Sequence, residues 1–183
     1  MPARPDIRYT FEDYLSIPED PAHRYEIIDG ELFVSPTPVL RHQQVVGNIF
    51  RIMSTLALEH GLGEVYGAPV TVRLRDDRVT EPDVTFVRTD RFGILDPRQG
   101  ILGPPDLVVE VLSPSNREYD RTLKRKRYMA SGVAELWIVD AEGDTIEVWR
   151  PDAAEPETPS ASVTWRVGEQ AFEIALADIF RRR

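Results

Sequence analysis

Two acidic residues interrupt stretches of sequence that are otherwise typical of buried β-strands. Glu110 lies within residues 107–112, where apolar side chains occupy both alternating phases, as in a central strand covered on both faces. A carboxylate there loses hydration, which costs on the order of several kcal/mol unless a cation or hydrogen-bond donors compensate. Asp83 lies near the start of a second predicted strand, residues 81–87. If the strands pair, we expect both carboxylates on one face, about 5 Å apart, where they can share a divalent cation.

The only two lysines of the chain lie in one basic segment. Lys124 and Lys126 stand within residues 117–127, whereas arginine supplies the other 20 of the 22 basic residues. An ammonium group is a compact point charge, unlike the guanidinium fork, so lysines confined to one segment suggest a specific role. On a helical wheel Lys126 lies nearer the apolar stripe, and Lys124 shares a side with Asp120 and Tyr128. An ordinary i,i+4 pair with Asp120 is the alternative role for Lys124.

The overall charge limits the classes of function. A net charge of -9 argues against a protein that coats nucleic acid by bulk electrostatics, because such binding relies on lysine and arginine neutralising phosphates. Residues 117–127 are a local exception with six basic and two acidic residues, which either form a basic patch or simply a solvated helix face. The chain has no cysteine, which excludes disulfides and thiolate metal sites. With no membrane-length apolar run and no signal-peptide pattern, we expect a cytoplasmic protein without a membrane partner.

A further carboxylate and a histidine fall on predicted regular elements. Asp29-Gly30 favours a type I′ turn between the strands of a hairpin over residues 25–34, which places Glu26 on a strand. Apolar residues recur at helical spacing over residues 40–60, with His42 in the first turn. The alternatives are an exposed hairpin carboxylate for Glu26 and a solvent-facing or capping residue for His42.

The remaining patterns predict one α/β domain over residues 1–183. A mixed β-sheet should carry the helices of residues 40–60 and 117–131, the second of which has Ser113 to Asn116 as cap candidates. The other expected elements are a helix from Thr10 to about residue 17, strands at 70–75 and 163–167, a surface loop at 88–105, a hairpin of residues 135–140 and 145–150, a mobile loop at about 151–162 and a helix at 176–180.

An ordered series of short motifs resembles a known family. The series comprises Arg-Tyr-Glu-Ile-Ile-Asp-Gly-Glu-Leu at residues 24–32, Glu-Pro-Asp at 81–83, Pro-Asp-Leu-Val-Val-Glu-Val-Leu-Ser-Pro-Ser at 105–115, Asp120-Arg121 with Lys124 and Tyr128, and Gly132-Val133 before the strand at 135–140. Together these motifs resemble the Uma-two family, which is classed with the restriction endonucleases, over about residues 10–150.

The resemblance implies a restriction-endonuclease-like fold and the metal-dependent site of the PD-(D/E)xK nuclease superfamily. In that reading Asp83 and Glu110 hold Mg²⁺ or Mn²⁺, and a lysine completes the site. The common motif has this lysine two residues after the second acid, where this chain has Leu112. The resemblance selects Lys124 as the replacement, with Lys126 as the alternative. It also adds Glu26 and His42 as positions that bind metal through water or orient other groups.

The expected activity is therefore Mg²⁺-dependent hydrolysis of DNA phosphodiester bonds by an endonuclease. A homodimer is expected because such an enzyme must cut two strands. Two alternatives remain: a binding protein that keeps the fold without the reaction, suggested by the acidic charge and by Leu112, and a nuclease for RNA or branched DNA. For the carboxylates themselves, the alternative is a buried pair satisfied by arginines.

Overall fold

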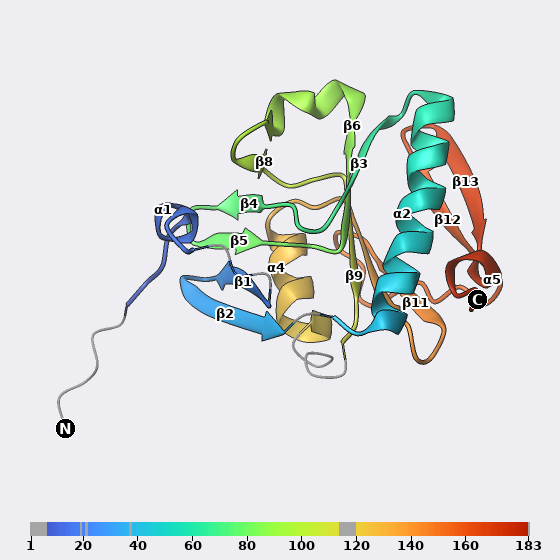
Figure 1. Cartoon of the computed structure of the whole chain (residues 1–183). Coiled ribbons are helices and arrows are strands. Elements are labelled where there is room, and N and C mark those ends of the chain that lie inside the picture. The colour runs from blue at the N-terminus through green and yellow to red at the C-terminus, as the bar shows by residue number, and fades with distance from the viewer. Residues whose placement is uncertain (1–6, 19, 21, 37, 114–119, 183) are drawn as a thin grey trace.

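A computed structural model of the chain describes residues 7–18, 20, 22–36, 38–113 and 120–182. Within these residues the strands form a five-stranded sheet, a six-stranded sheet and a two-stranded hairpin. The architecture is mixed α/β, with the two larger sheets side by side and the helices against them (Figure 1). None of the helices in the described part of the chain combines the length and apolar character that crossing a bilayer requires.

The five-stranded sheet forms the centre of the molecule. Its order is β11-β10-β9-β6-β3, with β9 and β10 parallel and the other neighbours antiparallel. All five residues of β9 are buried, as the uninterrupted apolar run around Glu110 predicts. The strands are β3 (Gly63–Gly67), β6 (Val84–Arg88), β9 (Leu107–Val111), β10 (Glu135–Asp140) and β11 (Thr145–Trp149).

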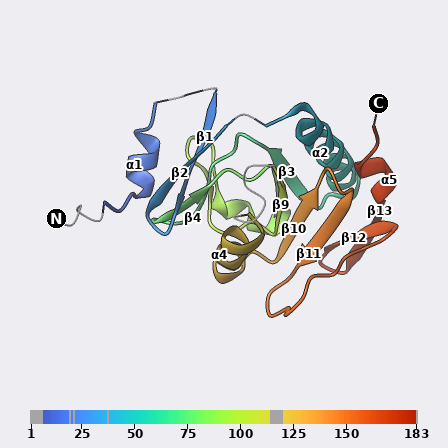
Figure 2. The same cartoon turned by 90° about the horizontal axis from the view of Figure 1, so that it is seen from below.

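Each face of this sheet packs against a different layer (Figure 2). One face meets α2 (Leu40–His60), α5 (Leu176–Ile179) and the hairpin of β12 (Ser162–Val167) with β13 (Gln170–Ala175). The other face meets α4 (Arg125–Ala130) and part of the six-stranded sheet. The α2 helix ends at Gly61, whose left-handed conformation (φ 61°) suits glycine. The central strands are therefore covered on both faces.

The six-stranded sheet, of order β2-β1-β5-β4-β8-β7, carries the N-terminal hairpin. Asp29 and Gly30 have positive φ values of 52° and 80°, as a type I′ turn requires. A capping box between Thr10 and Asp13 begins α1 (Phe11–Leu15), and Phe11 packs on this sheet. The strands are β1 (His23–Ile28), β2 (Glu31–Pro36), β4 (Val72–Arg75), β5 (Arg78–Thr80), β7 (Leu95–Asp96) and β8 (Gly100–Leu102).

The structure confirms both predicted hairpins and corrects several other expectations. Two sheets stand where a single one was expected, and the strands β3, β5 and β13 were not predicted. The glycines at both ends of β3 and the mostly exposed side chains of β13 explain why their patterns are weak. The surface-loop prediction for residues 88–105 is wrong, because this segment holds the 3₁₀-helix η1 (Thr89–Ile94) and β7 and β8, with Ile101 buried in the core.

The predictions for residues 113–131 and for residues 151–162 are tested only in part by the residues that the structure describes. The predicted cap at 114–116 and residues 117–119 of the predicted helix 117–131 lie outside them. The described part begins with a π-helical turn, η2 (Asp120–Lys124), that leads into α4. In the segment 151–162, Glu157 forms an isolated β-bridge with Val148, and the mobility of the segment stays a prediction.

Candidate active site

Asp83 and Glu110 lie on the same face of the central sheet. The antiparallel register pairs Val84 with Val109, so the residues one step further along, Asp83 and Glu110, come opposite each other. The backbone N–H of Val111 donates to Oδ2 of Asp83 at 2.9 Å, which ties the end of β9 to this carboxylate. The side chains of Asp83 and Glu110 are only 2% and 5% exposed. The two strands pair as the sequence pattern predicts, and the two buried acids lie on one face of the sheet.

Asp83 is surrounded by hydrogen-bond donors. Arg24 Nη1, from β1, lies 2.7 Å from Oδ1, and His42 Nε2, from the first turn of α2, lies 3.1 Å from Oδ2. Burial alone raises the pKa of Asp83, but the hydrogen bond and charge of His42 together with the Arg24 guanidinium outweigh it, so the pKa lies below its usual value. Asp83 is therefore a carboxylate at neutral pH.

Glu110 and Glu26 share the ammonium group of Lys124. Lys124 Nζ lies 2.8 Å from Oε2 of Glu26 and 3.4 and 3.5 Å from the two carboxylate oxygens of Glu110. The hydroxyl of Tyr128 donates to Oε1 of Glu110 at 2.6 Å. Burial, with the charge of Glu110 adding to it, raises the pKa of Tyr128 well above its usual value, so this group remains a neutral donor. Lys124 is itself buried, whereas Lys126 is exposed, so only Lys124 meets the carboxylates.

The site lies where the two larger sheets meet. Arg24 and Glu26 come from β1 of the six-stranded sheet, Glu110 comes from β9 of the central sheet, and Lys124 comes from η2. Asp83 directly precedes β6, which begins at Val84 and not at Glu81 as predicted. The backbone N–H of Glu81 donates to Oε1 of Glu26 at 3.2 Å, which joins the two sheets at this point. Residues far apart in the sequence thus converge on one buried cluster.

The exposed alternatives for Glu26 and His42 are wrong. Glu26 is 6% exposed and His42 is 4% exposed, and each contacts another member of the cluster. The N-cap of α2 is Val39, without a side-chain hydrogen bond, so His42 does not cap the helix. Among the described residues, Nδ1 of His42 is buried without a hydrogen-bond partner. The arginine alternative holds in part, since Asp83 does pair with Arg24.

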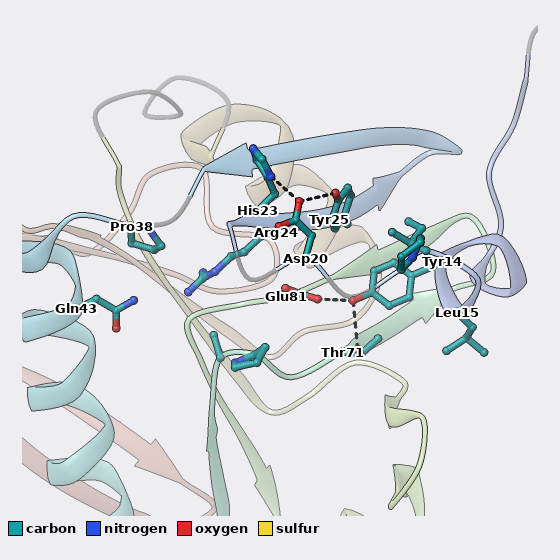
Figure 3. Close-up of a pocket in the computed structure, with 14 residues that line it drawn as sticks. Tyr14, Leu15, Asp20, His23, Arg24, Tyr25, Pro38, Gln43, Thr71 and Glu81 are labelled. Carbon is teal, nitrogen blue, oxygen red and sulfur yellow. Dashed lines mark hydrogen bonds and ion pairs between the residues drawn. The ribbon is translucent and has the colours of Figure 1, made fainter.

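Sequence reasoning did not assign a role to Arg24, Glu81 or Tyr128, although all three stand inside the quoted motifs. Glu81 accepts a hydrogen bond from the hydroxyl of Tyr14, whose oxygen also lies 3.3 Å from that of Thr71 (Figure 3). Burial raises the pKa of Glu81, and the nearby charge of Glu26 adds to the rise. The sequence could have indicated that Glu81 belongs to the site, because it lies two residues before Asp83 in the same motif.

The cluster contains the carboxylate oxygens that hard divalent cations prefer, but those of Asp83, Glu26 and Glu110 already pair with donors of the protein. Four carboxylates, those of Glu26, Glu81, Asp83 and Glu110, stand against the cations Arg24 and Lys124, with His42 beside them. Among the described residues no three histidine or acidic side chains converge as metal ligands. Mg²⁺ often binds through only one or two carboxylates and completes its shell with water and phosphate oxygens, so two acids suffice. A cation here would compete with Arg24 and Lys124 for the same oxygens.

A solved structure has the same fold. A crystal structure from Anabaena variabilis ATCC 29413, described as "a putative nuclease belonging to DUF820", superposes with a TM-score of 0.75 at 22% identity, over 93% of this chain and 97% of that one. At this identity the likeness shows the mixed α/β fold of that protein and no more. No curated protein matches the chain.

The sequence assigns the family. A family model described as "Putative restriction endonuclease" matches residues 11–177, which is most of the chain. The protein belongs to this family, Uma2, and the resemblance noted from the ordered motifs is therefore confirmed.

Proposed function

We propose that the protein is a divalent-metal-dependent endonuclease that hydrolyses DNA phosphodiester bonds at the cluster of Asp83, Glu110 and Lys124. The observation that carries the proposal is the convergence of two buried acids from paired strands with the buried ammonium group of Lys124. Membership of the Uma2 family supports the nuclease class. The motif lysine is absent after Glu110, where this chain has the buried, apolar Leu112, and Lys124 brings an ammonium group to Glu110 from another element.

Asp83 and Glu110 would hold Mg²⁺ or Mn²⁺. When bound, the ion would lower the pKa of a water molecule and offset charge on a phosphate oxygen. Arg24 and His42 keep Asp83 ionised, and Tyr128 fixes Glu110 through its hydrogen bond.

Lys124 would orient the attacking water or face the charge that develops on the phosphate. An ammonium group has three donors and no acceptor, so it can contact a carboxylate and a substrate oxygen at once. Glu26 positions Lys124 through their 2.8 Å ion pair.

The test is the conversion of supercoiled plasmid to nicked and linear DNA in Mg²⁺ or Mn²⁺. We expect Asp83→Ala and Glu110→Ala each to lower the rate at least about 100-fold, because a ligand that supports several kcal/mol of transition-state stabilisation is lost. Leu58→Ala, on the exposed outer side of α2, is the control that keeps full activity. Cleavage that survives both acidic substitutions would refute the proposal. Parallel assays with RNA and with branched DNA identify the preferred substrate.

The second candidate is a binding protein that has this fold and does not cleave. It is favoured by the saturation of Asp83, which accepts hydrogen bonds from Arg24, His42 and the backbone of Val111. Titration calorimetry with Mn²⁺ separates the two candidates. Binding that Asp83→Ala abolishes supports the nuclease, and the absence of binding supports the second candidate.

We further propose that two copies act together, since each chain would supply one site for one strand. Sedimentation of the protein alone and with a DNA duplex measures the stoichiometry. A single copy on the duplex during cleavage would contradict this proposal.

A further inference from the structure

A cavity of about 820 Å³ opens beside the buried cluster that forms the proposed reaction centre. It lies between α1, the start of β1, the first turn of α2 and the segment that leads into β4 (Figure 3). Two of its lining residues also belong to the cluster: Arg24, which pairs with Asp83, and Glu81, whose backbone binds Glu26. A molecule in the cavity therefore lies next to the proposed reaction centre.

The walls of the cavity combine ring and aliphatic surfaces with hydrogen-bonding side chains, which eight of its 14 lining residues carry. Tyr14, Tyr25, Ile17 and Pro18 supply apolar surface, and the amide of Gln43 can both donate and accept hydrogen bonds. Its size falls in the range of roughly 300–1,000 Å³ that is usual for small-molecule sites. Walls that offer both apolar surface and hydrogen-bonding groups suit a flat heteroaromatic ring with polar edges.

The charges of the cavity argue against a phosphate group as its occupant. Its two basic lining residues, Arg24 and His23, are each paired at 2.7 Å, with Asp83 and Asp20 respectively. Two acidic residues, Asp20 and Glu81, also line it, so these described groups give no excess of positive charge. Phosphate binding normally draws on such an excess. The neutral part of a nucleotide, its base, fits these walls better than its phosphate does.

We propose that this cavity binds an unpaired base of the nucleic-acid strand whose phosphodiester lies at Asp83 and Glu110. The proposal rests on the proposed nuclease function for the identity of the ligand and names its substrate class: single-stranded or locally opened DNA. A base inside a duplex is stacked and paired, so it enters such a cavity only after leaving the stack. Tyr25 is the stacking surface, and Gln43, next to His42 in the sequence, contacts the edge of the base.

The test is a binding measurement that does not depend on cleavage. Fluorescence anisotropy compares a labelled 12-nucleotide single strand with the duplex of the same sequence, using the full chain with Ca²⁺ in place of Mg²⁺. We expect the single strand to bind at least about 10-fold more tightly than the duplex.

Variants of the cavity assign the site. Tyr25→Ala should weaken single-strand binding about 10-fold, as expected for the loss of a base-aromatic stack, whereas Tyr25→Phe should retain it. Gln43→Trp places a large side chain from an exposed helix position at the cavity and should weaken binding similarly without disturbing the core. Leu58→Ala, away from the cavity, should bind like the unmodified protein.

The two proposals fail in different ways. Equal binding of single strand and duplex, with Tyr25→Ala and Gln43→Trp both behaving like Leu58→Ala, overturns the base-binding proposal even if plasmid is cleaved. Single-strand binding that depends on Tyr25 and Gln43 supports it even if no cleavage occurs, in which case the nuclease proposal alone is refuted.

Discussion

Replacing Lys124 by methionine tests whether this ammonium group holds the site together. Lys124 is 6% exposed, and its Nζ lies 2.8 Å from Glu26 and 3.4 Å from Glu110, so the substitution removes a cation that two buried carboxylates share. Removing one partner of a buried ion pair typically costs about 3–5 kcal/mol. For a chain of 183 residues, each kcal/mol corresponds to roughly 2–4 °C, so the melting temperature should fall by roughly 6–20 °C.

Urea unfolding in EDTA gives the free energy of unfolding directly, and Lys126→Met is the matched control. Lys126 is exposed in the same segment, so its substitution should change the free energy of unfolding by no more than about 0.5 kcal/mol. Adding Glu26→Gln to Lys124→Met should restore part of the loss, because one of the two uncompensated charges is then removed.

Unfolding of the same variants in the presence of a divalent metal tests whether Lys124 and a cation use the same carboxylates. If the carboxylates left by Lys124→Met hold a cation, Mn²⁺ should stabilise this variant more than the unmodified protein, in which Lys124 competes for the same oxygens. Equal stability of Lys124→Met and Lys126→Met in EDTA would refute the proposed role of Lys124. An equal response of the Lys124 variant and the unmodified protein to Mn²⁺ would refute the competition.

Other substitutions address the remaining parts of the structure. Tyr128→Phe removes the 2.6 Å hydrogen bond to Glu110 and should cost about 1.5–3 kcal/mol in urea unfolding, since the acceptor is charged. The pKa of Asp83 is lower in the folded protein than its ordinary value of 3.8, so its ionised form stabilises the fold at pH values above 3.8, and this stabilisation is lost as the pH falls below about 4. Urea unfolding at several pH values between 3 and 7 should therefore show a smaller loss of stability in acid for Asp83→Asn than for the unmodified protein. Gly63→Ala would place a Cβ 2.1 Å from a backbone carbonyl oxygen of β6, so thermal melts should show a loss of about 1–3 kcal/mol in the free energy of unfolding. Gly47→Ala, which has open space around it on α2, should raise the free energy of unfolding by about 0.5–1 kcal/mol.

The sequence was most informative where local chemistry and the fold agree. Asp29-Gly30 defined the first hairpin, and a carboxylate inside an apolar strand at Glu110 indicated that partners had to lie nearby. Those partners come from other elements, so their identity depends on tertiary structure. Spacing on a helical wheel could not choose between Lys124 and Lys126, because the described segment begins with a π-helical turn, in which the 3.6-residue period does not hold.

The contacts between the sheets were outside the reach of sequence patterns. Hydrophobic alternation shows that a strand has a buried face, but it does not show which layer covers that face. Arg24 and Glu26 on β1 face the central sheet only because β1 belongs to a second sheet that packs against it, which was not foreseen. The roles of these residues in a reaction stay predictions.

The position of the cluster between two sheets has a consequence for when the protein can act. Its charged groups are supplied by segments spread from Arg24 to Lys124, and the folding of either sheet alone brings together only part of them. If the protein is the nuclease proposed above, a nascent or partly unfolded chain would lack the complete site, and cleavage would require both sheets to have folded and packed together. Hydrogen exchange at the amides of β1, followed alongside recovery of cleavage during refolding, would time that step.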